Sequence, residues 1–138
     1  MKRVVWFFIA VAWMIQGCVS STSPKPSVDC RSRLEAKAWH LVSIDNEEVK
    51  LRAPVTLKID ETGRIGGFDG CNSYFGKVKL TDSQITFGPI GSTRKLCRGE
   101  AGEMERRLLS FFKGTKWWQI DEGGDLILFD DEHRLIFK

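Results

Sequence analysis

The sequence predicts one small α+β domain, built mostly from short antiparallel strands with a single main helix. With 138 residues the chain has room for one domain, because a single hydrophobic core usually spans roughly 100 to 200 residues. Most of its periodic segments alternate apolar and polar residues between clusters of turn residues, which is typical of strands with one covered face. Only the segment around residues 104–112 has the period of a helix.

Residues 1–17 are predicted to be a signal peptide that is removed before the protein folds. Lys2 and Arg3 make a basic start, and residues 4–15 follow without a charge. This run of about a dozen apolar residues is shorter than the roughly 20 that a membrane-spanning helix needs. A short uncleaved anchor is the alternative.

Cys18 is the predicted site of lipid attachment. Residues 15–18 read Ile-Gln-Gly-Cys and resemble a lipobox, in which a small residue precedes a cysteine whose thiol is acylated before cleavage. Gly17 gives the peptidase access to the bond, and sulfur is the nucleophile that takes the lipid. An ordinary signal peptide that ends near a cysteine is the alternative.

Residues 18–38 are predicted to be the lipidated N-terminus and a flexible tether. Serine, threonine and proline dominate residues 20–27, and this composition cannot bury apolar surface. Residues 31–37 could add one helical turn. Val19, rather than aspartate, follows the acylated cysteine, so we expect sorting to the outer membrane, facing the periplasm.

The charge of the mature chain argues against nucleic acid as a partner. Removing residues 1–17 takes away two basic residues and no acidic ones, so the net charge falls from +3 to +1. Binding to nucleic acid depends on clustered Lys and Arg that neutralise phosphates. No basic stripe is visible in the sequence.

The strands before the helix follow from residues that alternate with a period of two. Trp39, Leu41 and Ser43 are expected on one face of the first strand. His40, Val42 and Ile44 are expected on the other. Residues 45–48 look like a turn, and residues 60–63 and 81–83 are expected to close hairpins. The predicted strands cover residues 39–44, 55–59, 64–68, 77–80 and 84–87.

The helix is predicted from Met104, Leu108, Phe111 and Phe112, with charged residues between them, and Gly114 fits its C-terminal stop. Three more short strands are expected after it. They cover residues 116–121, 126–129 and 135–137, with turns at residues 123–124 and 130–134.

Three cysteines remain if Cys18 carries lipid, in a compartment where disulfides persist. We expect one pair and one leftover. Cys71 with Cys97 is preferred because both lie inside the folded domain, while Cys30 borders the tether. The other pairings, or two buried free thiols, are the alternatives.

The glycine-rich segment of residues 66–72 predicts a structural turn. Glycines adopt positive φ, and the side chain of Asn72 can hydrogen-bond nearby backbone. A phosphate cradle would need consecutive N–H groups at a helix start, usually with a lysine after the last glycine. Here Cys71 and Asn72 follow instead.

No catalytic or metal-binding pattern is visible, so neither an enzyme nor a cofactor is predicted. A thiol enzyme would need a cysteine activated by His40 or His133, and their spacing does not support it. C-x-x-C and H-x-x-x-H spacings are absent. The acidic residues at 100–105 and 130–132 are interpreted as solvated faces. Glycoside hydrolysis would need two carboxylates that face each other across a cleft, and such a pair cannot be recognised from sequence.

A candidate binding groove is predicted from four aromatic residues. Trp117 and Trp118 adjoin Lys116, and Phe111 and Phe112 precede them at the end of the helix. An acyl chain or an apolar segment of a partner would fit such a groove. The alternative is that one tryptophan fills the core while the other covers its rim.

Several motifs together resemble the META domain, or HslJ-like, family. The most specific is the order of Gly70-Cys71-Asn72 followed by Thr93 and Cys97. Four further patterns agree with it. They are Trp39-x-Leu41, Glu105 ahead of two leucines, Leu-x-Leu at residues 126–128 and Leu-x-Phe at residues 135–137. The resemblance covers residues 39–138. Lys95-Leu96 stands where the family usually has methionine and alanine.

The resemblance implies a strongly bent, half-open antiparallel β barrel with the helix packed against its interior. It also implies a non-enzymatic envelope lipoprotein, linked to heat shock and envelope stress. We therefore expect a META-like domain that binds a protein partner or a hydrophobic molecule in the periplasm. A structural or stress-protective accessory without a ligand, or a secretion-associated, pilotin-like lipoprotein, is the alternative.

Overall fold

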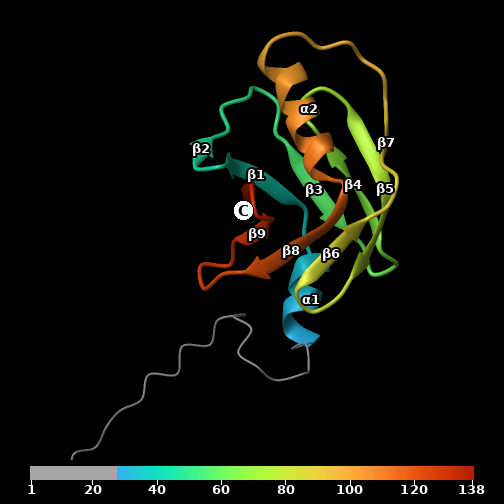
Figure 1. The fold of residues 1–138 in the computed structure, drawn as a ribbon, viewed down its shortest axis with the longest axis vertical. Helices are drawn as coiled ribbons and strands as arrows, with labels where there is room; N and C mark the ends of the chain where they lie inside the picture. Colours follow the sequence, from blue (N-terminus) through green and yellow to red (C-terminus); the bar gives the residue numbers. More distant parts are fainter. Residues whose placement is uncertain (1–27) are drawn as a thin grey trace, which may run out of the picture.

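The computed structural model describes residues 28–138 (Figure 1). The predicted signal peptide and the lipidation of Cys18 lie outside the described residues. Two helices are present, α1 (Val28–Glu35) and α2 (Glu100–Phe111). The strands are β1 (Trp39–Ile44), β2 (Glu47–Glu48), β3 (Thr56–Ile59), β4 (Arg64–Phe68), β5 (Ser73–Leu80), β6 (Gln84–Phe87), β7 (Gly91–Ser92), β8 (Gly114–Ile120), β9 (Leu126–Phe129) and β10 (Arg134–Phe137).

Eight of these strands form a closed antiparallel barrel, in the order β10-β9-β8-β6-β5-β4-β3-β1. The ring closes where β1 pairs with β10, with Leu41 opposite Phe137. Two backbone hydrogen bonds of 2.8 Å between His40 and Lys138 extend this contact. The expected half-open barrel is therefore wrong. Alternation along the sequence shows that a strand has a covered face, but it does not show which strand lies beside it.

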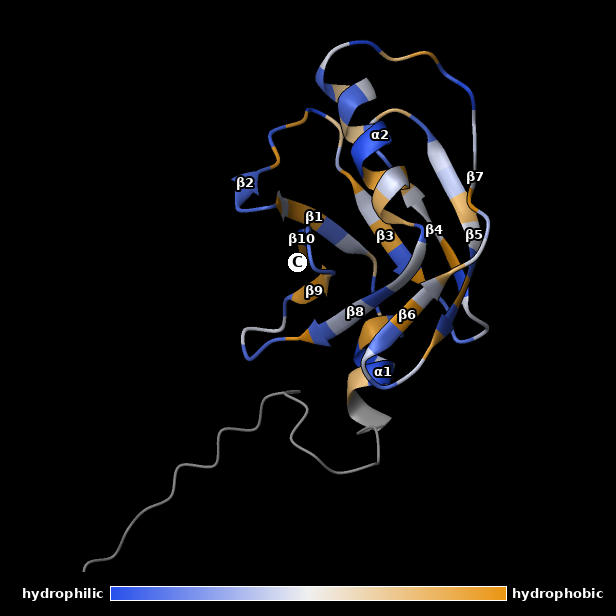
Figure 2. Ribbon diagram, viewed as in Figure 1, coloured by the Kyte–Doolittle hydropathy of each residue, from blue (hydrophilic) through white to orange (hydrophobic). Residues whose placement is uncertain are grey.

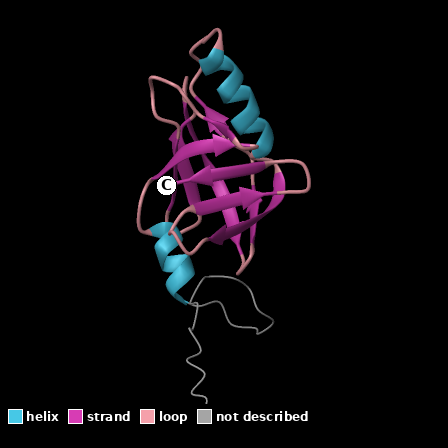
Figure 3. Ribbon diagram, turned by 90° about the vertical axis from the view of Figure 1, so that its left-hand side faces the viewer, coloured by secondary structure: helices cyan, strands magenta, loops and turns pink. Residues whose placement is uncertain are grey.

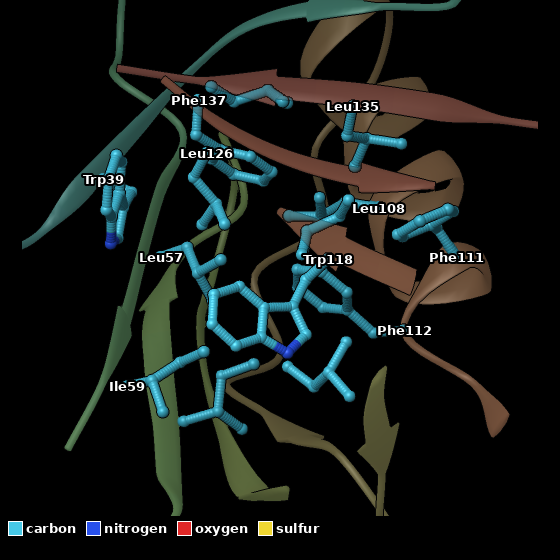
Figure 4. Close-up of a cluster of buried hydrophobic side chains, with 14 of the residues drawn as sticks. Trp39, Leu57, Ile59, Leu108, Phe111, Phe112, Trp118, Leu126, Leu135 and Phe137 are labelled. Carbon is cyan, nitrogen blue, oxygen red and sulfur yellow. The ribbon is translucent and has the colours of Figure 1, made fainter. Parts of the chain in front are cut away.

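The interior of the barrel is filled by side chains from all eight strands and both helices (Figure 4). The helices lie at opposite ends of the barrel, with α2 at the top and α1 at the bottom in both views (Figures 1 and 3). Leu108 of α2 and Leu34 of α1 are both completely buried. Burial of apolar surface at both ends therefore makes the helices part of the same core.

Apolar and polar residues alternate along several strands, as predicted (Figure 2). In β3, Leu57 and Ile59 are buried while Lys58 is exposed. The first strand is an exception, because a bulge between Leu41 and Ser43 shifts its register against β10. Ile44 is consequently buried on the same side as Trp39, against the expected alternation.

α1 begins inside the segment that was predicted to be a tether. Its Leu34 is buried, and the indole Nε1 of Trp39 donates a 2.9 Å hydrogen bond to the carbonyl of Leu34. The ammonium of Lys37 lies 4.1 Å from the centre of the same tryptophan ring. The packed domain therefore starts before Trp39.

α2 buries the apolar face that the sequence predicts, through Met104, Leu108 and Phe111. Its first turn carries Glu100 and Glu103, whose negative charges suit the positive end of the helix dipole. Phe112 follows the last turn and stacks on the ring of Phe87, with 4.8 Å between centroids. Within residues 28–138, no helix has both the length and the apolar character needed to cross a membrane.

Candidate functional site

The Gly70-Cys71-Asn72 motif forms the corner between β4 and β5. Gly70 has a φ of 97°, which strongly favours glycine. The carboxylate of Asp69 accepts hydrogen bonds from the N–H groups of Cys71 (2.9 Å) and Asn72 (2.6 Å). Both Asp69 and Asn72 are buried. The corner is thus held from within by backbone donors that face a carboxylate.

Asn72 holds the distant loop of residues 93–97 rather than only its own turn. Its Oδ1 accepts hydrogen bonds from the Lys95 N–H (2.7 Å) and the Thr93 hydroxyl (2.9 Å). Its Nδ2 donates to the Lys95 carbonyl (3.0 Å) and to the carboxylate of Glu105 on α2 (2.9 Å). One side chain therefore links the β4–β5 corner, the loop and the helix.

Cys71 and Cys97 form a disulfide, as preferred from the sequence, with Cα atoms 5.9 Å apart. It fastens the far end of the same loop, beside the Asn72 contacts. Cys30 is not a free cysteine, so the expectation of one leftover cysteine is wrong. Cys30 lies in α1 and packs against the core, which explains why it does not behave as part of a free tether.

Two glycines of the predicted turn lie instead inside β4. Gly67 pairs with Tyr74 of β5, and a Cβ at this position would come within 2.0 Å of the Thr56 carbonyl oxygen. The Tyr74 hydroxyl donates a 2.6 Å hydrogen bond to that same carbonyl. Glycine is therefore required at position 67 because neighbouring backbone approaches closely, not because the chain turns.

The environment of Tyr74 makes it a structural donor. Burial, reinforced by the negative charge of Asp69, raises the pKa of Tyr74 far above its usual value. The phenol thus stays protonated and keeps its bond to Thr56. The second carboxylate oxygen of Asp69 is buried without a hydrogen-bond partner among the described residues.

The four aromatic residues predicted to line a groove are not brought together at the surface. Phe111, Phe112 and Trp118 are buried in the core (Figure 4). Trp117 is 44% exposed and faces outward from β8. Trp118 is therefore the tryptophan that fills the core. Its indole N–H donates a 3.0 Å hydrogen bond to the Thr81 carbonyl.

Two surface hollows lie beside α2 instead, and Arg107 and Ile44 line both of them. The first measures about 300 Å³. Its apolar residues are Ile44, Val49, Leu51 and Met104, and its charged residues are Glu47, Glu48, Glu100, Glu103, Lys50 and Arg107. Four carboxylates thus face two cations around an apolar floor, which makes the hollow acidic.

The second hollow measures about 420 Å³ and lies between the C-terminal half of α2 and the β9–β10 turn. Its charged groups are largely paired with one another. The carboxylate of Asp45 lies 2.9 Å from His133 Nδ1, within hydrogen-bond distance, and Lys116 pairs with Asp130. Arg107 separates the two hollows, with nitrogens 3.8 Å from Asp45 and 3.4 Å from Glu47.

These contacts keep the carboxylates of the second hollow ionised. The N–H of Arg134 donates to Asp45 and lowers the pKa of that carboxyl, and His133 and Arg107 act in the same direction. Burial alone would raise the pKa of Asp130, but the hydrogen bond from Lys116 and two backbone N–H groups lower it to about 2. The groups are stabilised as charges, which suits electrostatic recognition.

The family is decided by a match to the whole described domain. The family model of the META domain matches residues 32–138. The chain belongs to the META domain family. In this META domain, the motif residues Gly70, Cys71, Asn72 and Thr93 form the corner and the loop attachment described above.

Two solved structures share the fold of this META domain. One is described as the NMR structure of the protein from Burkholderia xenovorans, with a TM-score of 0.63 and 25% sequence identity over 87% of this chain and 93% of that chain. The other is described as the NMR structure of the protein, with a TM-score of 0.66 and 21% identity over 78% and 92%. A comparison with curated proteins found no match.

The sequence did not single out the hollows of this META domain. The acidic residues at 100–105 and 130–132 were predicted to be solvated faces, and no binding role was predicted for Arg107. One signal was available, because Arg107 follows Met104 by three residues and therefore borders the buried face of the helix. Its partners Asp45 and Glu47 come from a turn whose position depends on barrel closure.

Proposed function

We propose that this protein is a non-enzymatic lipoprotein of the bacterial cell envelope whose META domain binds a protein partner in the periplasm. Cys18 would carry the lipid, and the domain would act at the outer membrane under envelope stress. Family membership supports the kind of domain. The lipobox-like segment ahead of Cys18 supports the anchor.

The filled barrel interior is the observation that directs this proposal toward a protein partner rather than a hydrophobic molecule. Phe111, Phe112 and Trp118, which were candidates to line an apolar groove, occupy the core. An acyl chain would have to displace them, and removing a large aromatic residue from a core costs about 3 to 5 kcal/mol. The available recessed surface lies outside the barrel, beside α2.

The chemistry of the first hollow indicates the kind of partner segment. An apolar floor that includes Met104 and Leu51 lies beneath exposed Glu47, Glu48 and Glu103. A segment with an apolar residue flanked by Lys or Arg would bury its side chain on the floor and place its charges near the carboxylates. Methionine adapts its shape to different partners.

The anchor is tested by intact mass spectrometry of the protein purified from membranes. The proposal expects an acylated N-terminus at Cys18, and fractionation should place the protein in the outer membrane. An unmodified Met1, or a protein found in the cytoplasm, would disprove the anchor.

The partner site is tested by placing a photo-crosslinking residue at Ser110, which lines the second hollow and is exposed. The matched control carries the same residue at Lys113, which is also exposed and lines neither hollow. The proposal expects one discrete crosslinked species from position 110, which disappears when Glu47→Lys combined with Glu103→Lys reverses two carboxylate charges of the first hollow. Equal crosslinking from both positions would refute a specific site and favour a structural accessory without a ligand.

A further inference from the structure

The outer face of β3, β4 and β5 carries four exposed cations, Lys58, Arg64, Lys77 and Lys79. The register places them on one side of the sheet. Arg64 lies opposite Lys77, and Lys58 lies opposite Gly66, which in turn lies opposite Phe75. Residues two apart on a strand share a face. We call this surface the basic face.

Two large apolar side chains are exposed on or beside the basic face. Phe75 is 61% exposed and lies on the same side of β5 as Lys77. Leu96 is 87% exposed, in the loop that follows β7. Because β7 pairs with β5 and Phe75 lies opposite Gly91, Leu96 is five residues of chain away, about 17 Å at most.

The cations of the basic face are not neutralised by neighbours. Within residues 28–138, none of the four forms an ion pair. The nearest acidic groups are Asp60 and Glu61 in the β3–β4 hairpin and Asp82 in the β5–β6 turn. Asp60 lies beside Arg64 and interacts with its charge, and its carboxylate accepts hydrogen bonds from the N–H of Arg64 and from the hydroxyl and N–H of Thr62.

The loop that carries Leu96 adds three exposed cations, Arg94, Lys95 and Arg98. It is fixed at Lys95 by Asn72 and at its end by the Cys71–Cys97 disulfide. The loop therefore presents an apolar tip among positive charges without needing to be ordered on binding. Pre-organisation of this kind reduces the entropic cost of association.

The acidic hollow lies away from β5, which carries two of the four cations of the basic face. In the ring order, β5 lies across from β10, whereas β3 lies next to β1, which borders the acidic hollow together with β2. Figure 1 shows β2 and β5 on opposite sides of the barrel. The mature chain carries a net charge of only +1 by sequence (+3 less the two cations of residues 1–17). The positive face thus reflects the arrangement of charges rather than an excess of them.

We propose that the basic face lies directly on the surface of an anionic phospholipid bilayer. Cations near such a surface are attracted to it, and an exposed apolar side chain can enter the headgroup boundary. The inference deepens the proposed function, because lipid at Cys18 would hold the domain close to the membrane. The ten residue-to-residue steps from Cys18 to Val28 reach at most about 35 Å, so contact is sterically allowed.

The arrangement would give the two sides of the domain different roles. With β5 on the bilayer, the hollows beside α2 border strands β1 and β10, which lie away from β5 in the ring. A partner in the aqueous space could then reach Arg107 and the carboxylates around it, while the bilayer occupies the opposite side.

The test uses residues 18–138, produced without the signal peptide so that Cys18 is not acylated, and oxidised to form its disulfides. Co-sedimentation is measured with vesicles of phosphatidylcholine alone and with vesicles that contain phosphatidylglycerol. We expect binding only to the anionic vesicles, and a decrease when salt is raised. Lys58→Gln combined with Lys77→Gln should weaken binding about 25-fold, since each cation contributes about fivefold.

The matched control is Lys50→Gln combined with Lys138→Gln, which removes the same charge from exposed positions on the other side of the barrel. It should weaken binding less than about threefold. Leu96→Ser should weaken binding about fivefold, because the inserted apolar side chain is lost. Circular dichroism checks that every variant is folded.

Equal losses in the two double variants would overturn the proposal, because net charge alone would then explain binding. Equal binding to neutral vesicles, or no binding to either kind, would also overturn it and would leave an acidic protein as the partner of the basic face. The measurement is independent of the anchor, since it uses unacylated protein. Failure of acylation would appear in the mass spectrum and leave the vesicle result intact.

Discussion

Asn72→Ala should be among the most destabilising polar-to-alanine substitutions in this domain. The wild-type amide makes four hydrogen bonds of 2.7 to 3.0 Å, to Thr93, to Glu105 and twice to Lys95, and is 1% exposed. A neutral hydrogen bond contributes about 1 kcal/mol and one to a carboxylate about 2 kcal/mol. The sum of about 5 kcal/mol is reduced because water can reach the exposed loop, so we expect a loss of about 3 kcal/mol.

The loss of unfolding free energy is measured by urea unfolding under oxidising conditions, with tryptophan fluorescence as the signal. For a domain of this size, about 3 kcal/mol corresponds to a fall in Tm of about 12 °C. Gln119→Ala is the control, because its amide makes no side-chain hydrogen bond among the described residues, and it should change stability by less than about 0.5 kcal/mol. A loss below about 1 kcal/mol for Asn72→Ala would refute the reasoning, since the disulfide alone would then hold the loop.

The other predictions concern the disulfide, an ion pair and a close backbone approach. Replacing Cys71 and Cys97 together by serine should cost about 3.5 kcal/mol, from the entropy of a loop with a sequence separation of 26, measured by urea unfolding. Lys116→Met should cost about 1 kcal/mol at pH 7. Because the folded pKa of Asp130 is depressed to about 2, the pair stabilises the fold above the unfolded pKa, and this penalty should vanish as the pH falls through about 2. Gly67→Ala should cost more than about 3 kcal/mol, measured by thermal unfolding, because its Cβ would overlap a carbonyl oxygen.

Each of these predictions has a control within the same molecule. In a Cys30→Ser background, reducing the Cys71–Cys97 disulfide should give the same loss as the serine variant, and no loss would contradict the loop-entropy argument. A pH-independent effect of Lys116→Met would show that the lysine acts by packing. Gly123→Ala should be tolerated, because the nearest atom to its Cβ would lie 3.4 Å away. A tolerated Gly67→Ala would refute the steric argument.

Local alternation was sufficient to predict most of the strands. Leu57 and Ile59 flank an exposed Lys58, and β3, β6 and β10 lie almost where their periodicity placed them. The helix followed from Met104, Leu108 and Phe111 for the same reason. These elements depend on contacts between residues close in sequence and one covered face, and both leave a periodic signal.

Features that depend on distant pairing could not be predicted. The bulge that turns Ile44 inward exists because β1 pairs with β10, and Gly67 is required because Thr56 of another strand approaches it. The sequence showed that Asn72 could bond to backbone. It could not show that this backbone belongs to Lys95, because that contact depends on where the loop returns.

The hollows were missed for a related physical reason. Charged residues on the surface carry no periodic signal that separates a solvated residue from one in a recess. Arg107 meets Asp45 and Glu47 only after the barrel has placed the β1–β2 turn beside α2. The prediction of an aromatic groove was wrong for a different reason. Most of the aromatic residues that suggested it fill the interior of the barrel.

The closing contact between β1 and β10 also determines when the barrel can be completed during folding. β1 is the first strand of the domain and β10 is the last, so the seam joins the segments that are furthest apart along the chain. Until β10 arrives, β1 and β9 each keep an edge of unpaired backbone groups, which can recruit strands from other chains. A chain truncated before Arg134 should therefore aggregate even though most of its hydrophobic core residues are present.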